Sequence, residues 1–210
     1  MYIAIEGLKG SGKTTLLERL PSSLQVIGLQ AEMLCPTRSL GAEHPVELAL
    51  AGLQNDVARE QLYAARSNVR AAQTDWDAPL ILGDRSILTS YATRWERFSY
   101  AERIRGIDRV DALEWRIRRP DHVLFLDVPL CELLARLSAR TERSYGRQDE
   151  TPARLASAHA AYLEMQERAE ALGLHGIRWH RIDARGTPEQ VLAITLQLTL
   201  SLCRGISRAA

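Results

Sequence analysis

The sequence predicts an α/β fold with three layers, in which a central parallel sheet carries helices on both faces. The first observation is that short apolar runs at 1–5, 79–85 and 120–128 alternate with longer amphipathic stretches. Strands and helices that alternate in this way build a parallel sheet, because the crossover between parallel strands usually passes through a helix. The second observation is that the first apolar run leads into a glycine-rich segment and then into leucines at helical spacing. This order predicts a strand, a tight loop and a helix.

The composition is that of an ordinary globular protein and argues against several classes of function. With 210 residues, 46% of them hydrophobic and 25% charged, the chain is expected to form one domain over 1–210. Its formal net charge of +1 predicts neither a nucleic-acid partner nor a membrane-surface partner. Cys35, Cys131 and Cys203 have no disulfide or zinc spacing, which favours the cytoplasm. The first strand begins at the N-terminus, so we expect no signal peptide, and no apolar run reaches the roughly 20 residues of a membrane span.

In the first half of the chain, periodicity and turn residues define the expected elements. Residues 21–23 (Pro-Ser-Ser) predict a break after the first helix, and a second strand is expected within 24–34. Pro45 opens a short helical stretch over 46–53, and a longer helix is expected over 56–72. The apolar face expected for this longer helix comprises Val57, Leu62, Ala65 and Val69.

The second half continues the alternation. The expected elements are a strand at 79–85, helical segments within 87–118, a strand at 120–128, a helix at 130–139 and a strand at 177–182. Thr151 and Pro152 suit the N-cap and first turn of a long helix that ends at Gly173. A capping box at 187–190 predicts a last helix over 191–203. An alternation of leucines at 196, 198, 200 and 202 would suit a strand there instead.

The glycine-rich segment carries the strongest chemical signal. Residues 7–14 read Gly-Leu-Lys-Gly-Ser-Gly-Lys-Thr and fit the phosphate-binding pattern G-x-x-x-x-G-K-[ST]. Backbone N–H groups of such a loop, together with the helix N-terminus, attract phosphate, so the fold is expected to be of the P-loop NTPase type. We expect Lys13 to reach the β- and γ-phosphates of ATP and the Thr14 hydroxyl to bind Mg²⁺. The ATP-binding residues expected in this loop are Gly7, Gly10, Ser11, Gly12, Lys13, Thr14 and Thr15.

Six segments in the same order resemble the thymidylate kinase family of nucleoside monophosphate kinases, over nearly the whole chain. They are EGLKGSGKTT at 6–15, PTR at 36–38, LYAAR at 62–66, LILGDR at 80–85, RRPDHVLFLDVP at 118–129 and IDARGTPEQV at 182–191. The resemblance implies ATP-dependent phosphorylation of a (deoxy)nucleoside 5′-monophosphate to the diphosphate. It also implies ATP and Mg²⁺ as small-molecule partners and a possible homodimer.

Transfer between two phosphates needs positioning and cations more than it needs a base. The acceptor phosphate is already largely ionised at pH 7, because its second pKa is about 6. We therefore expect Arg38 and Arg85 to clamp the acceptor phosphate, and Asp84 to bind the hydration shell of Mg²⁺. In the resemblance, Leu62 and Arg66 belong to the stretch that binds the base. The residues expected on the acceptor side are Lys9, Arg38, Leu62, Arg66, Arg85 and Arg94.

A polar stretch at 140–150 is expected to form a mobile, arginine-rich lid. Arg143 and Arg147 are candidates for contacts in the transition state, and either Arg136 or Arg140 is expected to pack on the adenine ring. Arg185 lies in the segment that resembles the adenine-side loop. The ATP-binding set therefore also includes Arg136, Arg140 and Arg185, and the expected catalytic residues are Lys13, Arg85, Arg143 and Arg147.

Four positions depart from the family pattern, all on the acceptor side. Lys9 stands in place of an acidic residue, Leu62 in place of a stacking phenylalanine, and Arg94 near a family glutamine. Ser86 gives an Asp-Arg-Ser sequence similar to that of deoxynucleoside kinases. These departures predict measurable but weak phosphorylation of dTMP, with a different or modified nucleoside monophosphate preferred.

Two other functions are weighed against a monophosphate kinase. A deoxynucleoside kinase acting on a 5′-hydroxyl needs a base near that hydroxyl, usually a glutamate that ends the second strand. Here Glu32 is followed by Met-Leu-Cys-Pro and Arg38 is present, which favours a phosphate acceptor. A nucleotide-binding regulator without catalysis would not need the lid arginines.

Overall fold

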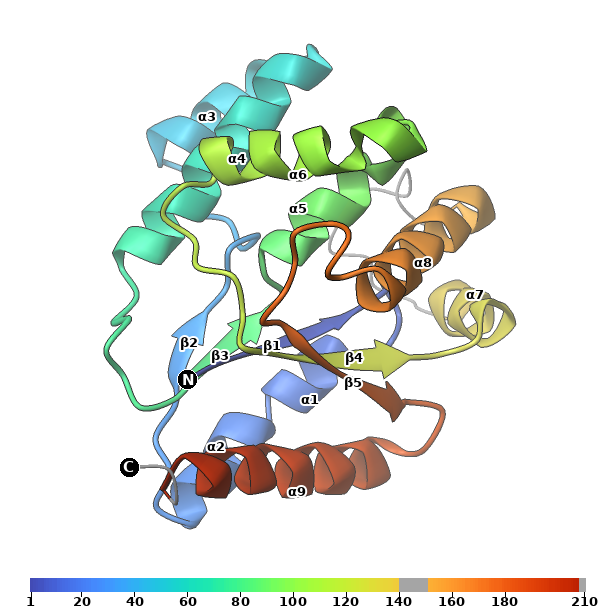
Figure 1. Ribbon diagram of the computed structural model, residues 1–210. Coiled ribbons are helices and arrows are strands. Elements are labelled where there is room, and N and C mark those ends of the chain that lie inside the picture. The colour runs from blue at the N-terminus through green and yellow to red at the C-terminus, as the bar shows by residue number, and fades with distance from the viewer. Residues whose placement is uncertain (140–150, 208–210) are drawn as a thin grey trace.

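The computed structural model describes residues 1–139 and 151–207. At its centre lies a five-stranded sheet in the order β2-β3-β1-β4-β5, with every neighbouring pair parallel (Figure 1). The strands are β1 (Tyr2–Gly7), β2 (Glu32–Leu34), β3 (Ile81–Asp84), β4 (His122–Asp127) and β5 (Arg178–Asp183). Because all five run the same way, the segments that follow them leave from one edge of the sheet.

Helices cover both faces of the sheet, as the alternation of segments predicts. One face carries α1 (Lys13–Leu17), α2 (Leu20–Val26) and α9 (Pro188–Ser207), which lie against one another (Figure 1). The other face carries α4 (Asp56–Ala72), α5 (Ile87–Arg94), α6 (Arg103–Leu113) and α8 (Pro152–Glu167) (Figure 1). Two further helices, α3 (Pro45–Gly52) and α7 (Leu130–Ser138), pack beside α4 and α8, and two short 3-10 turns occupy Trp95–Arg97 and Tyr100–Glu102. The predicted three-layer α/β fold is confirmed.

The central strands form the core. Ile3, Ile5, Leu82, Val123 and Leu124 are fully buried between the two helical layers. Strands buried on both faces read as continuous apolar runs, and this is why the sequence identifies β1, β3 and β4 without any alternation. The short helices at Pro45–Gly52 and Leu130–Ser138 also lie where the sequence predicts them.

Two boundaries in the N-terminal half differ from the sequence prediction. Residues 21–23 do not form a break, because they lie within α2. Pro21 occupies the first turn, where its missing N–H has no helical partner to lose. The hydroxyls of Ser22 and Ser23 donate to the Arg19 carbonyl at 2.8 and 3.0 Å. Residues 24–26 are therefore helical, and the second strand is confined to Glu32–Leu34.

The buried face of α4 is also not the predicted one, although the predicted bounds of 56–72 are confirmed. Val57 is 54% exposed, and the buried residues of the helix are Glu60, Ala64, Ser67 and Ala71. The face contains a carboxylate that is paired with an arginine of α5, so a search for apolar periodicity does not find it.

The C-terminal helices show one difference and one confirmation. Helix α8 starts after Thr151 as predicted but ends at Glu167, and the chain then turns to Gly173, whose φ is +69°. Helix α9 confirms the helical alternative for 191–203. Its fully buried Thr195 and Thr199 are four residues apart and donate to the carbonyls one turn earlier, at 2.7 and 2.8 Å. A strand would not bring these groups together.

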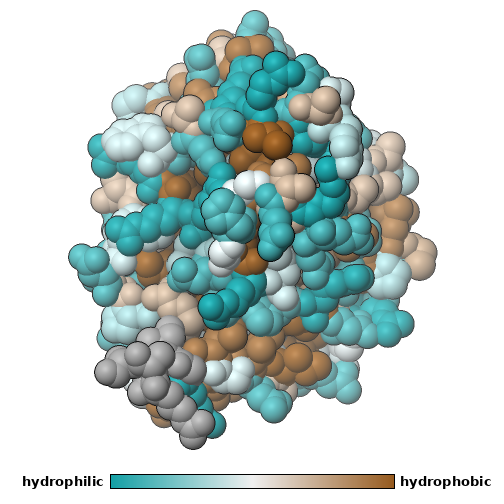
Figure 2. Space-filling model, in the orientation of Figure 1, coloured by the Kyte–Doolittle hydropathy of each residue, from teal (hydrophilic) through white to brown (hydrophobic). Residues whose placement is uncertain are grey.

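The surface is mostly polar on the face shown in Figure 2, where apolar side chains gather in the lower part of the view around α9. Ile194 of this helix is 49% exposed. Within residues 1–139 and 151–207, no helix has both the length and the apolar character needed to cross a membrane.

The capping box of α9 makes a testable contribution to stability. The Thr187 hydroxyl accepts from the Gln190 N–H at 3.3 Å, and the Gln190 side chain accepts from the Thr187 N–H at 2.9 Å. Thr187→Ala should lower the free energy of unfolding by about 1 kcal/mol, because alanine cannot accept this bond. Urea denaturation measures the change, and Thr187→Ser is the matched control. An alanine variant as stable as the wild type would contradict the role of the cap.

Candidate active site

The loop between β1 and α1 has the backbone of a phosphate cradle. Gly7, Gly10 and Gly12 have positive φ values of 148°, 91° and 96°. A Cβ at Gly7 would lie 2.8 Å from both the Leu126 carbonyl and the Ser11 hydroxyl, so no larger residue fits there. Since non-glycine residues rarely adopt these angles, the glycines allow the tight course of the loop.

Lys13 lies under this loop and is largely buried. Its ammonium donates to the carbonyls of Gly7 and Leu8 at 2.6 and 2.8 Å, and to the Ser11 hydroxyl at 3.4 Å. The cation is therefore held inside the turn of the loop, where it can exchange carbonyl oxygens for phosphate oxygens. This is the position that the sequence pattern gives to the donor-side lysine.

A fully buried carboxylate stands directly before the loop. Glu6 is 0% exposed and accepts four hydrogen bonds. Its Oε1 accepts from the Ser86 N–H at 2.7 Å and the Ser86 hydroxyl at 2.8 Å. Its Oε2 accepts from the hydroxyls of Thr89 and Tyr162 at 2.9 and 2.8 Å. Burial and the nearby Glu6 charge raise the pKa of Tyr162 above its ordinary value, so this hydroxyl keeps its proton.

Glu6 was not expected as a site residue from the sequence, although it is a carboxylate near the end of an otherwise apolar strand. Its contacts connect three elements: β1, the start of α5, and α8. The Asp84-Arg85-Ser86 segment links β3 to α5 and directly precedes that helix, so the phosphate loop and this segment share one buried anchor.

Arg85 adopts an unusual backbone conformation. Its φ of 72° is the one positive value at a non-glycine residue in the described part of the chain. This conformation costs roughly 1–2 kcal/mol for a residue with a Cβ. The Arg85 N–H donates to the Ile5 carbonyl at 3.1 Å, and the next N–H donates to Glu6. The strained turn at the end of β3 is thus held by β1, next to the phosphate loop.

Arg38 and Asp84 meet at the same edge of the sheet. The Arg38 Nη2 lies 3.8 Å from the Asp84 Oδ2, and the Arg38 side chain is 65% exposed. Asp84 is paired in register with Ile5 of β1, two residues before the phosphate loop. Arg38, from the segment after β2, and Asp84, at the end of β3, therefore lie at the edge of the sheet where the phosphate loop leaves β1.

The oxygen donors at this edge fit a magnesium ion bound together with phosphates. Mg²⁺ uses one or two protein oxygens and completes its octahedron with water and substrate phosphates. Thr14 lies in the first turn of α1 and is exposed, and Asp84 is the last residue of β3. Among residues 1–139 and 151–207, no three His, Cys, Asp or Glu side chains cluster as metal ligands, which argues against an all-protein metal cage in this part.

Arg66 is placed differently from what the prediction of a base-reading residue implies. Its Nε and Nη2 donate to the two oxygens of Glu47 at 2.7 and 2.6 Å. The paired donors that would read a base are thus directed at a carboxylate of α3. Leu62 lies one turn before Arg66 and is half-buried. Between them, Tyr63 is 39% exposed, with its ring 5.1 Å from the Arg66 guanidinium.

Arg94 differs most from its predicted role on the acceptor side. It is 6% exposed, and its guanidinium pairs with Glu60 at 2.7 Å and Glu114 at 3.5 Å. It also donates to the Ser90 carbonyl at 2.9 Å. Burial raises the pKa of Glu114 above its ordinary value, despite the nearby Arg94 charge. The side chain joins α4, α5 and the end of α6, which makes it a structural cation.

Two residues expected on the adenine side do come together. Arg136 of α7 donates to the carbonyls of Ala184 and Arg185, at 2.9 and 3.3 Å. Arg185 pairs with Asp183 at 2.6 Å, and both side chains are exposed. The loop after β5 is therefore tied to the helix that follows β4.

Asp127 closes the same edge of the sheet. Its carboxylate accepts from His159 of α8 at 2.9 Å and from Arg181 of β5. Burial would raise the pKa of Asp127, but the hydrogen bonds from Arg181 and His159 hold it below its ordinary value. Neither partner was expected from the sequence, because each is a lone residue with no motif around it.

The predicted lid at 140–150, with Arg140, Arg143 and Arg147, lies outside the described residues. Lys9 lies within the phosphate loop and is half-buried. The pairings of β1 with β3 and β4 bring the carboxyl ends of these three strands to one edge of the sheet.

Comparison with known proteins agrees with this geometry. Residues 5–193 match the family model described as thymidylate kinase. The chain is also 29% identical over 218 aligned positions to a protein named thymidylate kinase from Alkalilimnicola ehrlichii, and the match covers 95% of this chain and 92% of that protein. The phosphate loop, the Asp84-Arg85 turn and Arg38 all fall within the matched residues. The chain therefore belongs to the thymidylate kinase family and is an ATP-dependent nucleoside monophosphate kinase.

Proposed function

We propose that this kinase transfers the γ-phosphoryl group of ATP to dTMP, giving ADP and dTDP. The observation that supports this most is that Arg38 lies beside Asp84 and that the Arg85 N–H binds Ile5 of β1, two residues before the phosphate loop. One loop suits the polyphosphate of ATP, and two arginines beside it suit a second phosphate. The similar protein from Alkalilimnicola ehrlichii is named thymidylate kinase, and this chain belongs to the same family.

On the donor side, backbone N–H groups of residues 7–12 and the Lys13 ammonium hold the β- and γ-phosphates of ATP. The Thr14 hydroxyl and the Asp84 carboxylate, through its hydration shell, hold Mg²⁺ in this proposal. When bound, Mg²⁺ neutralises charge on the phosphate oxygens. Arg136, Arg140 and Arg185 serve the adenine end, and Arg143 and Arg147 contact the transferring group in the transition state.

On the acceptor side, the guanidinium groups of Arg38 and Arg85 reduce the repulsion between the two anionic phosphates. No general base is required, because the acceptor phosphate is already ionised. Each arginine can present two N–H groups to one phosphate, which fixes the direction of attack as well as the charge.

Three further proposals rest on the sequence and the family. The chain acts as a single kinase domain over 1–210, with the lid at 140–150. A homodimer and a cytoplasmic location remain predictions.

The deoxynucleoside kinase alternative is disfavoured by the position of Glu32. This residue begins β2, and its Oε1 accepts from the Asp75 N–H at 3.4 Å. It therefore lies at the opposite end of the strand from the phosphate loop and cannot serve as a base for a 5′-hydroxyl.

A coupled ADP-release assay across nucleosides and 5′-monophosphates tests the proposed acceptor. We expect activity with dTMP and none with nucleosides, and we expect a lower kcat/KM for dTMP than that of a variant carrying the family residues at positions 9 and 62, because Lys9 and Leu62 depart from the family pattern. Lys9→Asp combined with Leu62→Phe should shift preference toward dTMP, since aromatic stacking on a base contributes on the order of 1–3 kcal/mol. Activity with nucleosides alone would overturn the proposal. A wild-type kcat/KM for dTMP above about 10⁵ M⁻¹s⁻¹, with other monophosphates far behind, would show that the substitutions are neutral.

Lys13→Ala should abolish catalysis while leaving the fold intact. Losing a cation that contacts the transferring group should lower kcat by about 10³-fold, or roughly 4 kcal/mol of transition-state stabilisation. Steady-state kinetics with circular dichroism as the folding control measures this. Near-normal turnover in the variant would contradict the assignment of residues 7–14 as the loop that binds the phosphates of ATP.

A further inference from the structure

The segment that carries Arg38 is held along its whole backbone by its neighbours. We call residues 36–40 the acceptor loop. Its carbonyls accept from α4: Pro36 from Ser67 at 3.5 Å, Thr37 from Arg66 at 3.3 Å, Arg38 from Arg70 at 3.4 Å, and Ser39 from Arg70. Its last residue, Leu40, donates its N–H to Glu47 of α3 at 3.0 Å.

The Glu47 carboxylate accepts hydrogen bonds both from the acceptor loop and from α4. The carboxylate binds Arg66 through two hydrogen bonds and binds the Leu40 N–H through Oε1. Both side chains of the pair are largely buried, at 14% exposure for Arg66 and 12% for Glu47. The two parallel hydrogen bonds of such a pair hold the guanidinium and the carboxylate in one relative orientation, in addition to the attraction between their charges. Hydrogen bonds from Arg66 and Leu40 outweigh burial and hold the pKa of Glu47 below its ordinary value, so the carboxylate is charged at neutral pH.

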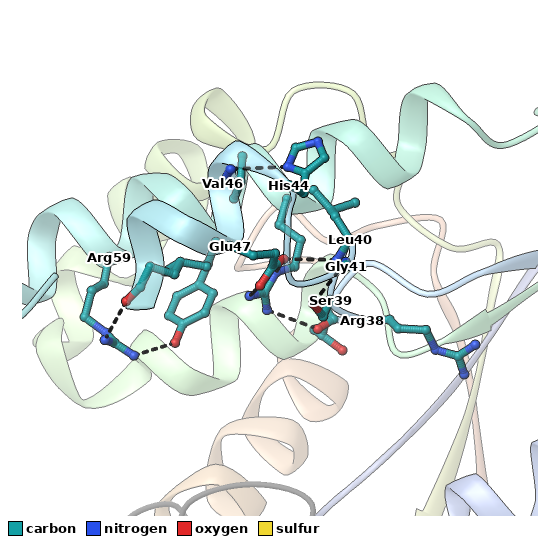
Figure 3. A network of polar contacts seen from close by, with 12 residues as sticks. Arg38, Ser39, Leu40, Gly41, His44, Val46, Glu47 and Arg59 are labelled. Carbon is teal, nitrogen blue, oxygen red and sulfur yellow. Dashed lines mark hydrogen bonds and ion pairs between the residues drawn. The ribbon is translucent and has the colours of Figure 1, made fainter. Parts of the chain in front are cut away.

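The Arg38 side chain points away from these hydrogen bonds. Figure 3 shows the Arg38 side chain extending away from the cluster of Ser39, Leu40 and Glu47. The backbone of the acceptor loop faces α3 and α4, while the Arg38 guanidinium reaches toward Asp84 at 3.8 Å. An arginine on a loop fixed by its backbone loses less freedom on binding a phosphate than one on a free loop.

We propose that Glu47 is a positioning residue of the acceptor site: through Arg66 and the Leu40 N–H it fixes the acceptor loop so that Arg38 meets the acceptor phosphate. Glu47 does not touch the substrate. The proposal rests on the proposed function, since it requires a phosphate-bearing acceptor. It predicts that Glu47 contributes to recognition of the phosphate and leaves recognition of the nucleoside unchanged.

Glu47→Gln tests this, with Glu43→Gln as the matched control, because Glu43 is an exposed carboxylate four residues before Glu47. Isothermal titration gives the dissociation constants of dTMP, thymidine and ATP. Glu47→Gln should weaken dTMP binding about tenfold, the size expected for losing a hydrogen bond to a charged group. Thymidine and ATP should bind as they do to the wild type, and Glu43→Gln should change nothing. Equal weakening of dTMP and thymidine, or unchanged dTMP binding, would overturn the proposal.

A double-mutant cycle separates positioning from a general structural effect. In an Arg38→Ala background, Glu47→Gln should cause no further loss of dTMP affinity, because its effect passes through Arg38. A full tenfold loss in that background would overturn the proposal. Glu47→Asp keeps the charge but has a shorter side chain that cannot hold Arg66 and the Leu40 N–H in the same way, so it should reproduce the phosphate-specific loss if Glu47→Gln fails to fold. A wild type that binds no nucleoside monophosphate would remove the proposed function together with this inference, whereas a wild-type-like Glu47→Gln variant removes this inference alone.

Discussion

The buried carboxylate of Glu6 is the interaction on which the site depends. A charge removed from water is costly unless its lone pairs are satisfied, and Glu6 meets this requirement with four donors. Those donors come from Ser86, Thr89 and Tyr162, so the carboxylate fixes the start of α5 and the middle of α8 against β1. The phosphate loop begins at the next residue. Donor loop and acceptor turn are thus placed by the same group.

Contacts with β1, including one to Glu6, also hold the strained turn at Arg85. A left-handed arginine persists only where neighbouring contacts determine it, and here the flanking N–H groups are bound by the Ile5 carbonyl and by Glu6. The arginines of the acceptor side then divide by environment. Arg38 is exposed and reaches toward Asp84, Arg66 is bound to Glu47, and Arg94 is buried between carboxylates. Exposed arginines remain available to a phosphate, and buried ones build the frame.

Much of the fold and part of the site could be predicted from the sequence, because those parts leave local signals. Contacts between residues that are distant in the sequence leave no such signal. Strands buried on both faces and capped helices leave local signals, so β1, β4 and α9 were predictable. The buried face of α4 was not, because Glu60 is polar and its burial depends on an arginine of another helix. The same holds at the site: the glycine pattern locates Lys13, but Glu6 and Glu47 act through partners distant in sequence. Such contacts exist only after the sheet has brought the segments together.

The central claim is that one edge of the sheet holds both nucleotides at once, with their phosphates facing each other. A compound in which adenosine and thymidine are joined 5′ to 5′ through an oligophosphate tests it directly by calorimetric titration. The account predicts that one molecule binds per chain, that it displaces both ATP and dTMP, and that it binds at least about tenfold more tightly than either, because the second contact becomes intramolecular. Unchanged dTMP binding in the presence of a saturating amount of this compound would show two separate sites and contradict the account.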